Sequence, residues 1–205
     1  MSVHVKICGV RTVDDALAAV EAGATAVGLN FVPSSPRFVD IATARAISRA
    51  LVRTKALVVG VVANLDVEEM RALVTSAELG CLQLHGDETA ADVEALLPHA
   101  YKAMPIANDD DVHAARAMPG DYLLVDAKVD GALGGSGETF EWSLVRLLAT
   151  ERRLTLAGGL NAGNVAEAVR VVRPWCVDVA SGVESAPGVK DYARMRAFVD
   201  AVRSA

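Results

Sequence analysis

Residues 56–85 read ALVVGVVANLDVEEMRALVTSAELGCLQLH, and this stretch decides the fold. The apolar run Ala56–Ala63 is typical of a strand that is buried on both faces. Asp66 is a residue type that often precedes the first turn of a helix, and Gly80 is one that often follows the last turn. A second apolar run, Cys81–His85, begins directly after that glycine. The stretch therefore predicts a strand, a helix and another strand.

The same unit is repeated along the whole chain. Short apolar runs predict eight strands, at His4–Cys8, Ala26–Phe31, Ala56–Ala63, Cys81–His85, Tyr101–Ile106, Tyr122–Ala127, Leu154–Ala157 and Val177–Ala180. Amphipathic segments predict helices over Thr12–Ala22, Thr43–Leu51, Asp66 to the residue before Gly80, Thr89–Leu97, Asp109–Ala117, Trp142–Ala149, Asn164–Val172 and Asp191–Arg203. Strict alternation of this kind predicts an α/β fold with a parallel sheet, and eight units close into a (β/α)₈ TIM barrel. We expect one domain over residues 1–205.

The composition limits the classes of partner. The 205 residues carry a formal net charge of −6, and the basic residues are scattered along the chain. Neither a nucleic acid nor an anionic membrane is therefore expected as a partner. The first residues do not resemble a signal peptide, and no apolar run of about 18 residues is present to span a bilayer. We expect a soluble protein with a small-molecule substrate.

The cysteines indicate the cellular compartment. Cys8, Cys81 and Cys176 are widely spaced, odd in number and not part of any CxxC pair. A disulfide framework or a zinc site is not expected from this pattern, and a reducing cytoplasm fits it best. We expect Cys81 and Cys176 to be core residues.

Polar and glycine-rich residues gather at one end of the predicted barrel. In such barrels the active site lies at the C-terminal ends of the strands, in the loops that lead to the helices. The residues at these positions are Lys6–Gly9, Pro33–Arg37, Gln83–Gly86, Val125–Asp126, the loop segment Gly134–Gly137, Ala157–Asn161 and Ala180–Glu184. This asymmetry itself indicates a functional site.

The loops after the seventh and eighth strands are candidates for a phosphate site. Gly158, Gly159 and Gly182 lack a Cβ, so their backbone N–H groups can approach phosphate oxygens closely. Ser181 can add a hydroxyl, and a helix beginning after Gly182 would add its partial positive charge. The alternative is that these glycines only turn the chain tightly.

Asp126 and Cys8 are candidates for proton transfer. Asp126 ends an apolar run, where burying a carboxylate is costly and desolvation raises its pKa toward that of a general acid. The alternative is a helix cap or an ion pair with Lys128. Cys8 ends the first strand, although a lone cysteine there is more often a small buried hydrophobe. A thiol is largely protonated at neutral pH, and Lys6, two residues earlier on the same face of the strand, is the candidate to stabilise a thiolate at this position.

Other polar side chains are expected inside the barrel. Gln83 and His85 alternate with leucines and should both point inward. His85 either lines the site or is an interior histidine whose hydrogen bonds are satisfied. Asp178 lies on the eighth strand, next to the first, and we hypothesise an ion pair between Lys6 and Asp178 beneath Cys8.

Taken together, the loop motifs resemble those of one enzyme family. They are KICG, the S-P-R loop, QLHG, VDA followed by GGSGETFEW, AGGLN and SGVESAPGVKD, in this order from Lys6 to Asp191. The set is similar to that of the phosphoribosylanthranilate isomerases of tryptophan biosynthesis. One departure is mild: Phe140-Glu141-Trp142 stands where the family more often has FDW.

The resemblance implies an isomerase that converts N-(5-phosphoribosyl)anthranilate to the 1-deoxyribulose 5-phosphate by an Amadori rearrangement, with neither cofactor nor metal. It implies Cys8 as general base and Asp126 as general acid. Arg37 is then the natural partner of the anthranilate carboxylate, because a guanidinium fork matches a carboxylate in two hydrogen bonds. As an alternative, Arg37 is an ordinary surface residue. Family members look mostly monomeric, so a monomer is expected rather than a homodimer.

Two other functions compete with this interpretation. A phosphosugar isomerase of histidine biosynthesis resembles a barrel with two aspartates on opposite strands and two similar halves, whereas Cys8 stands on the first strand here and no clear half-repeat is present. A non-catalytic phosphate-binding barrel would require neither Cys8 nor Asp126.

Overall fold

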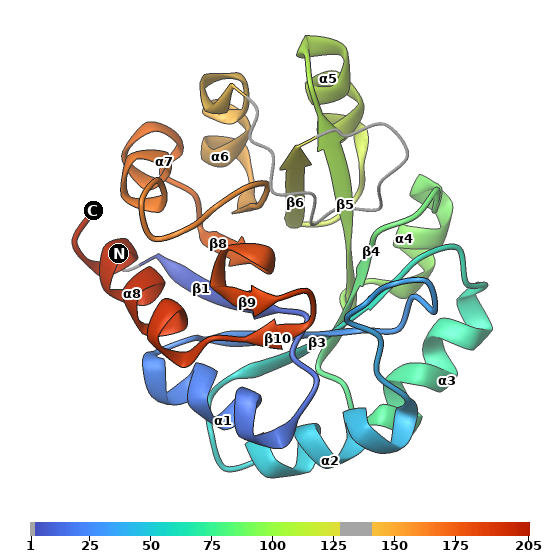
Figure 1. Ribbon diagram of the computed structural model, residues 1–205. Helices are drawn as coiled ribbons and strands as arrows, with labels where there is room; N and C mark the ends of the chain where they lie inside the picture. Colours follow the sequence, from blue (N-terminus) through green and yellow to red (C-terminus); the bar gives the residue numbers. More distant parts are fainter. Residues whose placement is uncertain (1–2, 128–140) are drawn as a thin grey trace.

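The computed structural model describes residues 3–127 and 141–205. Within these ranges the strands form a closed, parallel barrel in sequence order (Figure 1). They are β1 (His4–Cys8), β2 (Ala26–Asn30), β3 (Leu57–Val62), β4 (Cys81–Leu84), β5 (Ala100–Ile106), β6 (Tyr122–Ala127), β7 (Arg153–Leu156) and β8 (Cys176–Val179). The barrel closes where β1 pairs with β8, with Lys6 opposite Asp178 in the register. The predicted (β/α)₈ fold is confirmed.

The helices surround the barrel (Figure 1). They are α1 (Val13–Ala22), α2 (Ile41–Leu51), α3 (Val67–Ala77), α4 (Ala90–Leu96), α5 (Asp109–Ala117), α6 (Leu148–Glu151), α7 (Val165–Val172) and α8 (Tyr192–Arg203). Their starts follow from local chemistry: the Thr12 hydroxyl accepts from the N–H of Asp15, and Asp66 with Glu69 forms a reciprocal capping box. In the described ranges, none of these helices has the length and apolarity needed to cross a membrane.

Two predicted elements differ from the structure. The single helix expected over Trp142–Ala149 is wrong, since a 3₁₀ turn, η1 (Trp142–Val145), precedes the four-residue α6. The Glu141 side chain accepts from the N–H of Ser143, and the N–H of Arg146 reaches back only three residues, to the carbonyl of Ser143. This tighter i to i+3 bonding replaces the α-helical pattern.

The helix expected after Gly182 is also wrong. A three-residue 3₁₀ turn, η2 (Ser181–Val183), contains Gly182, and an antiparallel hairpin of β9 (Glu184–Ala186) and β10 (Val189–Lys190) follows. Between the two strands lie Pro187 and Gly188, a pair typical of tight turns. The partial positive charge of a regular helix is therefore not available directly after Gly182.

The core lies mainly between the barrel and the helices. Small aliphatic side chains fill this layer, and Phe198 of α8 is fully buried in it where α8 packs against α1. A second, small apolar cluster is formed by Ala103, Leu124 and Ala157. Buried polar and charged side chains on the strands include Lys6, Gln83 and Asp178.

Phe198→Ala should lower the free energy of unfolding by about 3–5 kcal/mol, because it removes a fully buried aromatic ring and leaves a cavity. Urea unfolding followed by circular dichroism measures the loss. The matched control is Leu147→Ala, at an exposed position, which should change stability by less than about 0.5 kcal/mol. Similar effects of the two substitutions would contradict the described packing of α8.

Candidate active site

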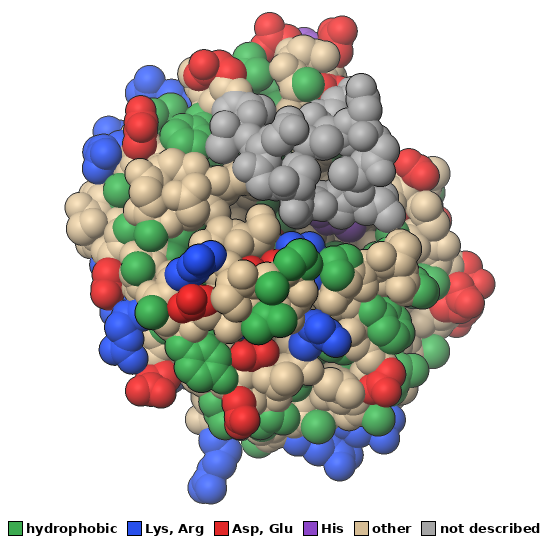
Figure 2. All heavy atoms as spheres, in the orientation of Figure 1, with side chains coloured by type: hydrophobic (Ala, Val, Ile, Leu, Met, Phe, Trp, Pro, Cys, Tyr) green, Lys and Arg blue, Asp and Glu red, His purple; other side chains and the backbone are tan. Residues whose placement is uncertain are grey.

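A pocket of about 280 Å³ lies at the C-terminal ends of the strands, and its volume suits a small molecule. It is lined by Cys8, Asn30, Val32, Ser34, Ser35, Pro36, Arg37, Val61, Gln83, His85, Asp126, Ala157, Gly158, Gly159, Leu160, Asp178, Val179, Ala180 and Ser181. On the face drawn in Figure 2, acidic and basic side chains are interspersed. The predicted site residues thus meet in one cavity, with Gly182 as the exception.

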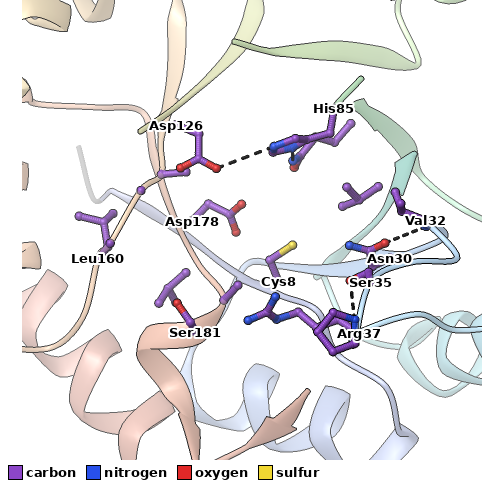
Figure 3. Close-up of a pocket in the computed structure, with 18 of the residues that line it drawn as sticks. Cys8, Asn30, Val32, Ser35, Arg37, His85, Asp126, Leu160, Asp178 and Ser181 are labelled. Atoms are coloured by element: carbon purple, nitrogen blue, oxygen red, sulfur yellow. Dashed lines mark hydrogen bonds and ion pairs between the residues drawn. The ribbon is translucent and has the colours of Figure 1, made fainter. Parts of the chain in front are cut away.

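Cys8 and Asp126 point into this cavity from strands β1 and β6, and Asp178 lies between them in the view of Figure 3. Space beside the thiol depends on Gly28 of β2, the register partner of Cys8. A Cβ at Gly28 would lie 2.7 Å from the Cys8 Sγ and 3.1 Å from the Lys6 Nζ. The sequence analysis missed this glycine, whose only signal was its place inside a strand.

Lys6 forms the predicted ion pair. Its Nζ donates to Asp178 Oδ2 at 2.8 Å and to Gln83 Oε1 at 2.9 Å, and the ammonium is almost completely buried. Burial alone would lower the pKa of Lys6, but the Asp178 carboxylate raises it well above its ordinary value. Lys6 is therefore charged at neutral pH. The second Asp178 oxygen, Oδ1, is buried and has no hydrogen-bond partner among the described residues.

The Cys8 thiol is held in its protonated form. Burial raises the pKa of Cys8 above its ordinary value, and the Asp178 carboxylate acts in the same direction. Lys6 and Lys190 lower the pKa, but they do not outweigh burial. Lys6 therefore stabilises the Cys8 thiolate as expected. Its effect on the pKa is smaller than that of burial, so Cys8 remains a thiol at neutral pH.

Asp126 lies beside His85. Asp126 Oδ1 accepts from the backbone N–H of Ala127 at 2.8 Å, and Asp126 Oδ2 is 3.8 Å from His85 Nε2. Burial lowers the pKa of His85 to about 4, and the nearby charges of Lys6 and Lys102 act in the same direction. His85 is therefore neutral at physiological pH, and its contact with Asp126 is not an ion pair. Lys128, the alternative partner of Asp126, lies outside the described residues.

The glycines after β7 and β8 have different roles. Gly158 has a φ of +92°, and a Cβ there would lie 3.0 Å from Asp126 Oδ1 and 2.7 Å from the Ala127 nitrogen. Gly158 therefore allows the loop to pack against the carboxylate. Gly159 and Ser181 line the pocket as expected. Gly182 is not among the residues that line it, and a Cβ at Gly182 would collide with the carbonyl oxygen of Leu160. The segment Gly134–Gly137 lies outside the described residues.

Arg37 is held by a partner that the sequence analysis did not identify. Its Nε and Nη2 donate to the two carboxylate oxygens of Glu184 at 2.8 and 2.9 Å. Lys190 donates to the same Glu184 at 2.8 Å and to the carbonyl of Ala180 at 3.0 Å. Burial opposes ionisation of Glu184, but the hydrogen bonds from Arg37 and Lys190 lower its pKa below the ordinary value. Two basic side chains thus face one carboxylate beside the pocket, and burial lowers the pKa of Lys190.

This arrangement corrects the expectation for Arg37 in two respects. The side chain is only 13% exposed, so the surface alternative is wrong. The edge of the guanidinium formed by Nε and Nη2 is occupied by Glu184, which leaves the end formed by Nη1 and Nη2 for a ligand. Glu184 and Lys190 lie on either side of the Pro-Gly turn of the hairpin. This spacing is the one feature of the sequence from which their contact could have been predicted.

The pocket-lining Asn30 was also missed; its Oδ1 accepts from the N–H of Val32 at 2.8 Å and so orders the loop after β2. Among the described residues, no group of three His, Cys, Asp or Glu side chains is arranged to hold a metal ion.

A (β/α)₈ barrel whose ionisable side chains Cys8, His85 and Asp126 face one small pocket at the C-terminal ends of the strands has the architecture of a barrel enzyme acting on a small molecule. The family described as N-(5'phosphoribosyl)anthranilate (PRA) isomerase matches residues 5–201. The chain is 47% identical to the N-(5'-phosphoribosyl)anthranilate isomerase of Pseudomonas aeruginosa (strain LESB58), over 99% of this chain and 96% of the relative. It therefore belongs to the phosphoribosylanthranilate isomerase family.

Solved structures agree with this assignment. The phosphoribosyl anthranilate isomerase of Thermotoga maritima superposes with a TM-score of 0.90 at 37% identity, over 99% of this chain and 100% of that one. A phosphoribosyl anthranilate isomerase in complex with reduced 1-(o-carboxyphenylamino)-1-deoxyribulose 5-phosphate has a TM-score of 0.87 at 35% identity, over 99% and 100% of the two chains.

Alkylation of the ligand-free protein by iodoacetamide tests the state of Cys8. Only the thiolate reacts, so the raised pKa predicts slow labelling of Cys8 at neutral pH and a rate that increases as the pH becomes alkaline. Peptide mass spectrometry measures labelling at each cysteine. Cys81 and Cys176, whose pKa burial raises to about 11 and about 12, should label more slowly still. Fast labelling of Cys8 at neutral pH would show instead that its thiol is ionised in the ligand-free protein.

Proposed function

We propose that this chain isomerises N-(5'-phosphoribosyl)anthranilate to 1-(2-carboxyphenylamino)-1-deoxyribulose 5-phosphate, a step of tryptophan biosynthesis. The observation that carries the proposal is that Cys8 and Asp126, from strands on different sides of the barrel, face one small pocket beside the loops after β7 and β8. The family to which the chain belongs supports the choice of substrate.

Asp126 acts as the general acid and Cys8 as the general base. Asp126 gives its proton to the furanose ring oxygen, the C1–O bond breaks, and the nitrogen lone pair forms a protonated Schiff base with C1. The Cys8 thiol, which is protonated in the resting pocket, first loses its proton to solvent. The resulting thiolate takes the proton from C2, and the electrons of that C–H bond form the enolamine. Protonation at C1 and loss of the C2 hydroxyl proton give the ketone. The isomerisation is redox-neutral, so an acid and a base suffice.

Charges around the pocket suit the two anionic parts of this substrate. The phosphate is bound by backbone N–H groups and the Ser181 hydroxyl in the loops after β7 and β8. The anthranilate carboxylate is bound by the end of the Arg37 guanidinium that Glu184 leaves open.

The same proposal includes a cytoplasmic location, supported by three free cysteines. It also includes a monomeric state. One solved structure is of monomers made from a dimeric isomerase of Thermotoga maritima. A monomeric state of this chain would therefore differ from the dimer of that relative.

The loss of anthranilate fluorescence tests the activity. Substrate formed in situ from anthranilate should be consumed when the protein is added, and Cys8→Ser and Asp126→Asn should reduce kcat by at least about 100-fold, because each removes one proton-transfer group. Circular dichroism should show that both variants remain folded. Near-normal turnover by a folded Asp126→Asn protein would reject Asp126 as the acid.

Arg37→Ala should chiefly raise KM, by about 10-fold to 100-fold, since it removes hydrogen bonds to a charged group of the substrate while the acid and base remain. Steady-state kinetics separates KM from kcat. The control is Arg49→Ala, which breaks an exposed ion pair with Glu78 away from the pocket and should leave KM unchanged. An unchanged KM for Arg37→Ala would argue against carboxylate binding by this residue.

A further inference from the structure

We propose that Gln83 is a positioning residue that fixes the neutral tautomer of His85, so that His85 presents an Nε2–H to the Asp126 carboxyl group. This inference rests on the proposed isomerase function for its catalytic consequence. Its structural part is independent of that function, because it concerns hydrogen bonds among residues of the chain itself.

Hydrogen bonds from Lys6 and Tyr101 fix the orientation of the Gln83 amide. Gln83 Oε1 lies 2.9 Å from Lys6 Nζ and 3.2 Å from the hydroxyl of Tyr101. An ammonium group has only donors, so the amide atom that faces it must be the carbonyl oxygen. Asp178 keeps Lys6 charged through its contact at 2.8 Å, and the side chains of Lys6 and Gln83 are buried away from water that could replace these bonds. The amide therefore cannot rotate by half a turn without placing NH₂ against NH₃⁺.

This orientation leaves the amide nitrogen facing His85. Gln83 Nε2 and His85 Nδ1 are 2.7 Å apart. The amide nitrogen can only donate, so His85 Nδ1 must be the acceptor and carry no proton. An imidazolium ring would place an N–H against the NH₂ group, which agrees with a His85 pKa lowered to about 4 by burial. The single ring proton is therefore on Nε2.

The ring proton then points toward Asp126. His85 Nε2 lies 3.8 Å from Asp126 Oδ2, and a dashed line in Figure 3 marks this contact. The distance is longer than a hydrogen bond, but the N–H dipole attracts the carboxylate charge that develops when Asp126 gives up its proton. The opposite tautomer would direct a nitrogen lone pair at the same charge. Gln83 thus acts on the acid through His85, without contacting Asp126.

The tautomer can be read directly. Long-range ¹H–¹⁵N spectra of protein containing ¹⁵N-histidine distinguish protonated from bare ring nitrogens, and His85→Asn identifies the His85 signals among the four histidines. At neutral pH we expect Nε2 protonated and Nδ1 bare. A proton on Nδ1 in the unmodified protein would overturn the inference, whether or not the protein has isomerase activity.

Gln83→Glu reverses the hydrogen bond at nearly constant volume. A carboxylate at this position accepts from Lys6 and can also accept from His85, so Nδ1 should gain a proton. With the proton on Nδ1 and Nε2 bare, His85 directs a lone pair at Asp126 and makes it a poorer acid, so kcat should fall by at least about 10-fold while KM changes by less than about 3-fold. A merely structural role for Gln83 would not move the ring proton. A bare Nδ1 in the folded variant, or an unchanged kcat with the proton moved, would overturn the catalytic part.

Tyr101→Phe is the matched control. It removes the second donor to Gln83 Oε1 but leaves Lys6, and Tyr101 does not line the pocket. The His85 spectrum should therefore stay as in the unmodified protein. A shifted tautomer in Tyr101→Phe would show that Lys6 alone does not orient the amide. If Gln83→Glu fails to fold, the unmodified protein and Tyr101→Phe still decide the tautomer.

If the unmodified protein consumes no substrate, the proposed function is rejected. The tautomer assignment is then still tested by the ¹H–¹⁵N spectra alone. If substrate is consumed but the ring proton is on Nδ1, only the role of Gln83 fails.

Discussion

A single buried charge, the ammonium of Lys6, constrains the rest of the site. An amine that is 2% exposed cannot remain charged without partners, because the desolvation cost of an unpaired ion exceeds several kcal/mol. Its partners come from two other strands, Asp178 on β8 and Gln83 on β4. Gly28 on β2 supplies the space for Nζ, since a Cβ there would lie 3.1 Å away. One charge thus constrains the residue types at positions on three other strands of the barrel, β2, β4 and β8.

The sequence predicted the barrel well because each strand is a continuous apolar run. No strand end in the barrel differs from its prediction by more than one residue. The prediction failed where elements are too short to show a period: the hairpin β9–β10 has strands of three and two residues, and η2 has three. Such segments are fixed by contacts with distant residues, as when Glu184 in β9 binds Arg37 of the loop after β2.

The sequence predicted which residues line the candidate site better than it predicted the hydrogen bonds among them. Parallel strands bring their C-terminal ends together, so any polar residue at a strand end becomes a neighbour of the others, and Cys8, Arg37, His85 and Asp126 indeed line one pocket. The direction of each bond depends on register between strands. Nothing in the local sequence indicates that Glu184 occupies one edge of Arg37, or that Lys6 turns the amide of Gln83 toward His85.

The ammonium of Lys6 also links Cys8 and Asp126, the proposed base and acid. It has three N–H groups: two are directed at Asp178 and Gln83, and its remaining interaction lowers the pKa of the Cys8 thiol. It acts on Cys8, the proposed base, by lowering the pKa of the thiol, and it acts on Asp126, the proposed acid, through Gln83 and His85. A guanidinium in this place would present a flat fork with no third direction toward the thiol. The tetrahedral ammonium therefore allows one residue to bind Asp178 and Gln83 and still to lower the pKa of the Cys8 thiol.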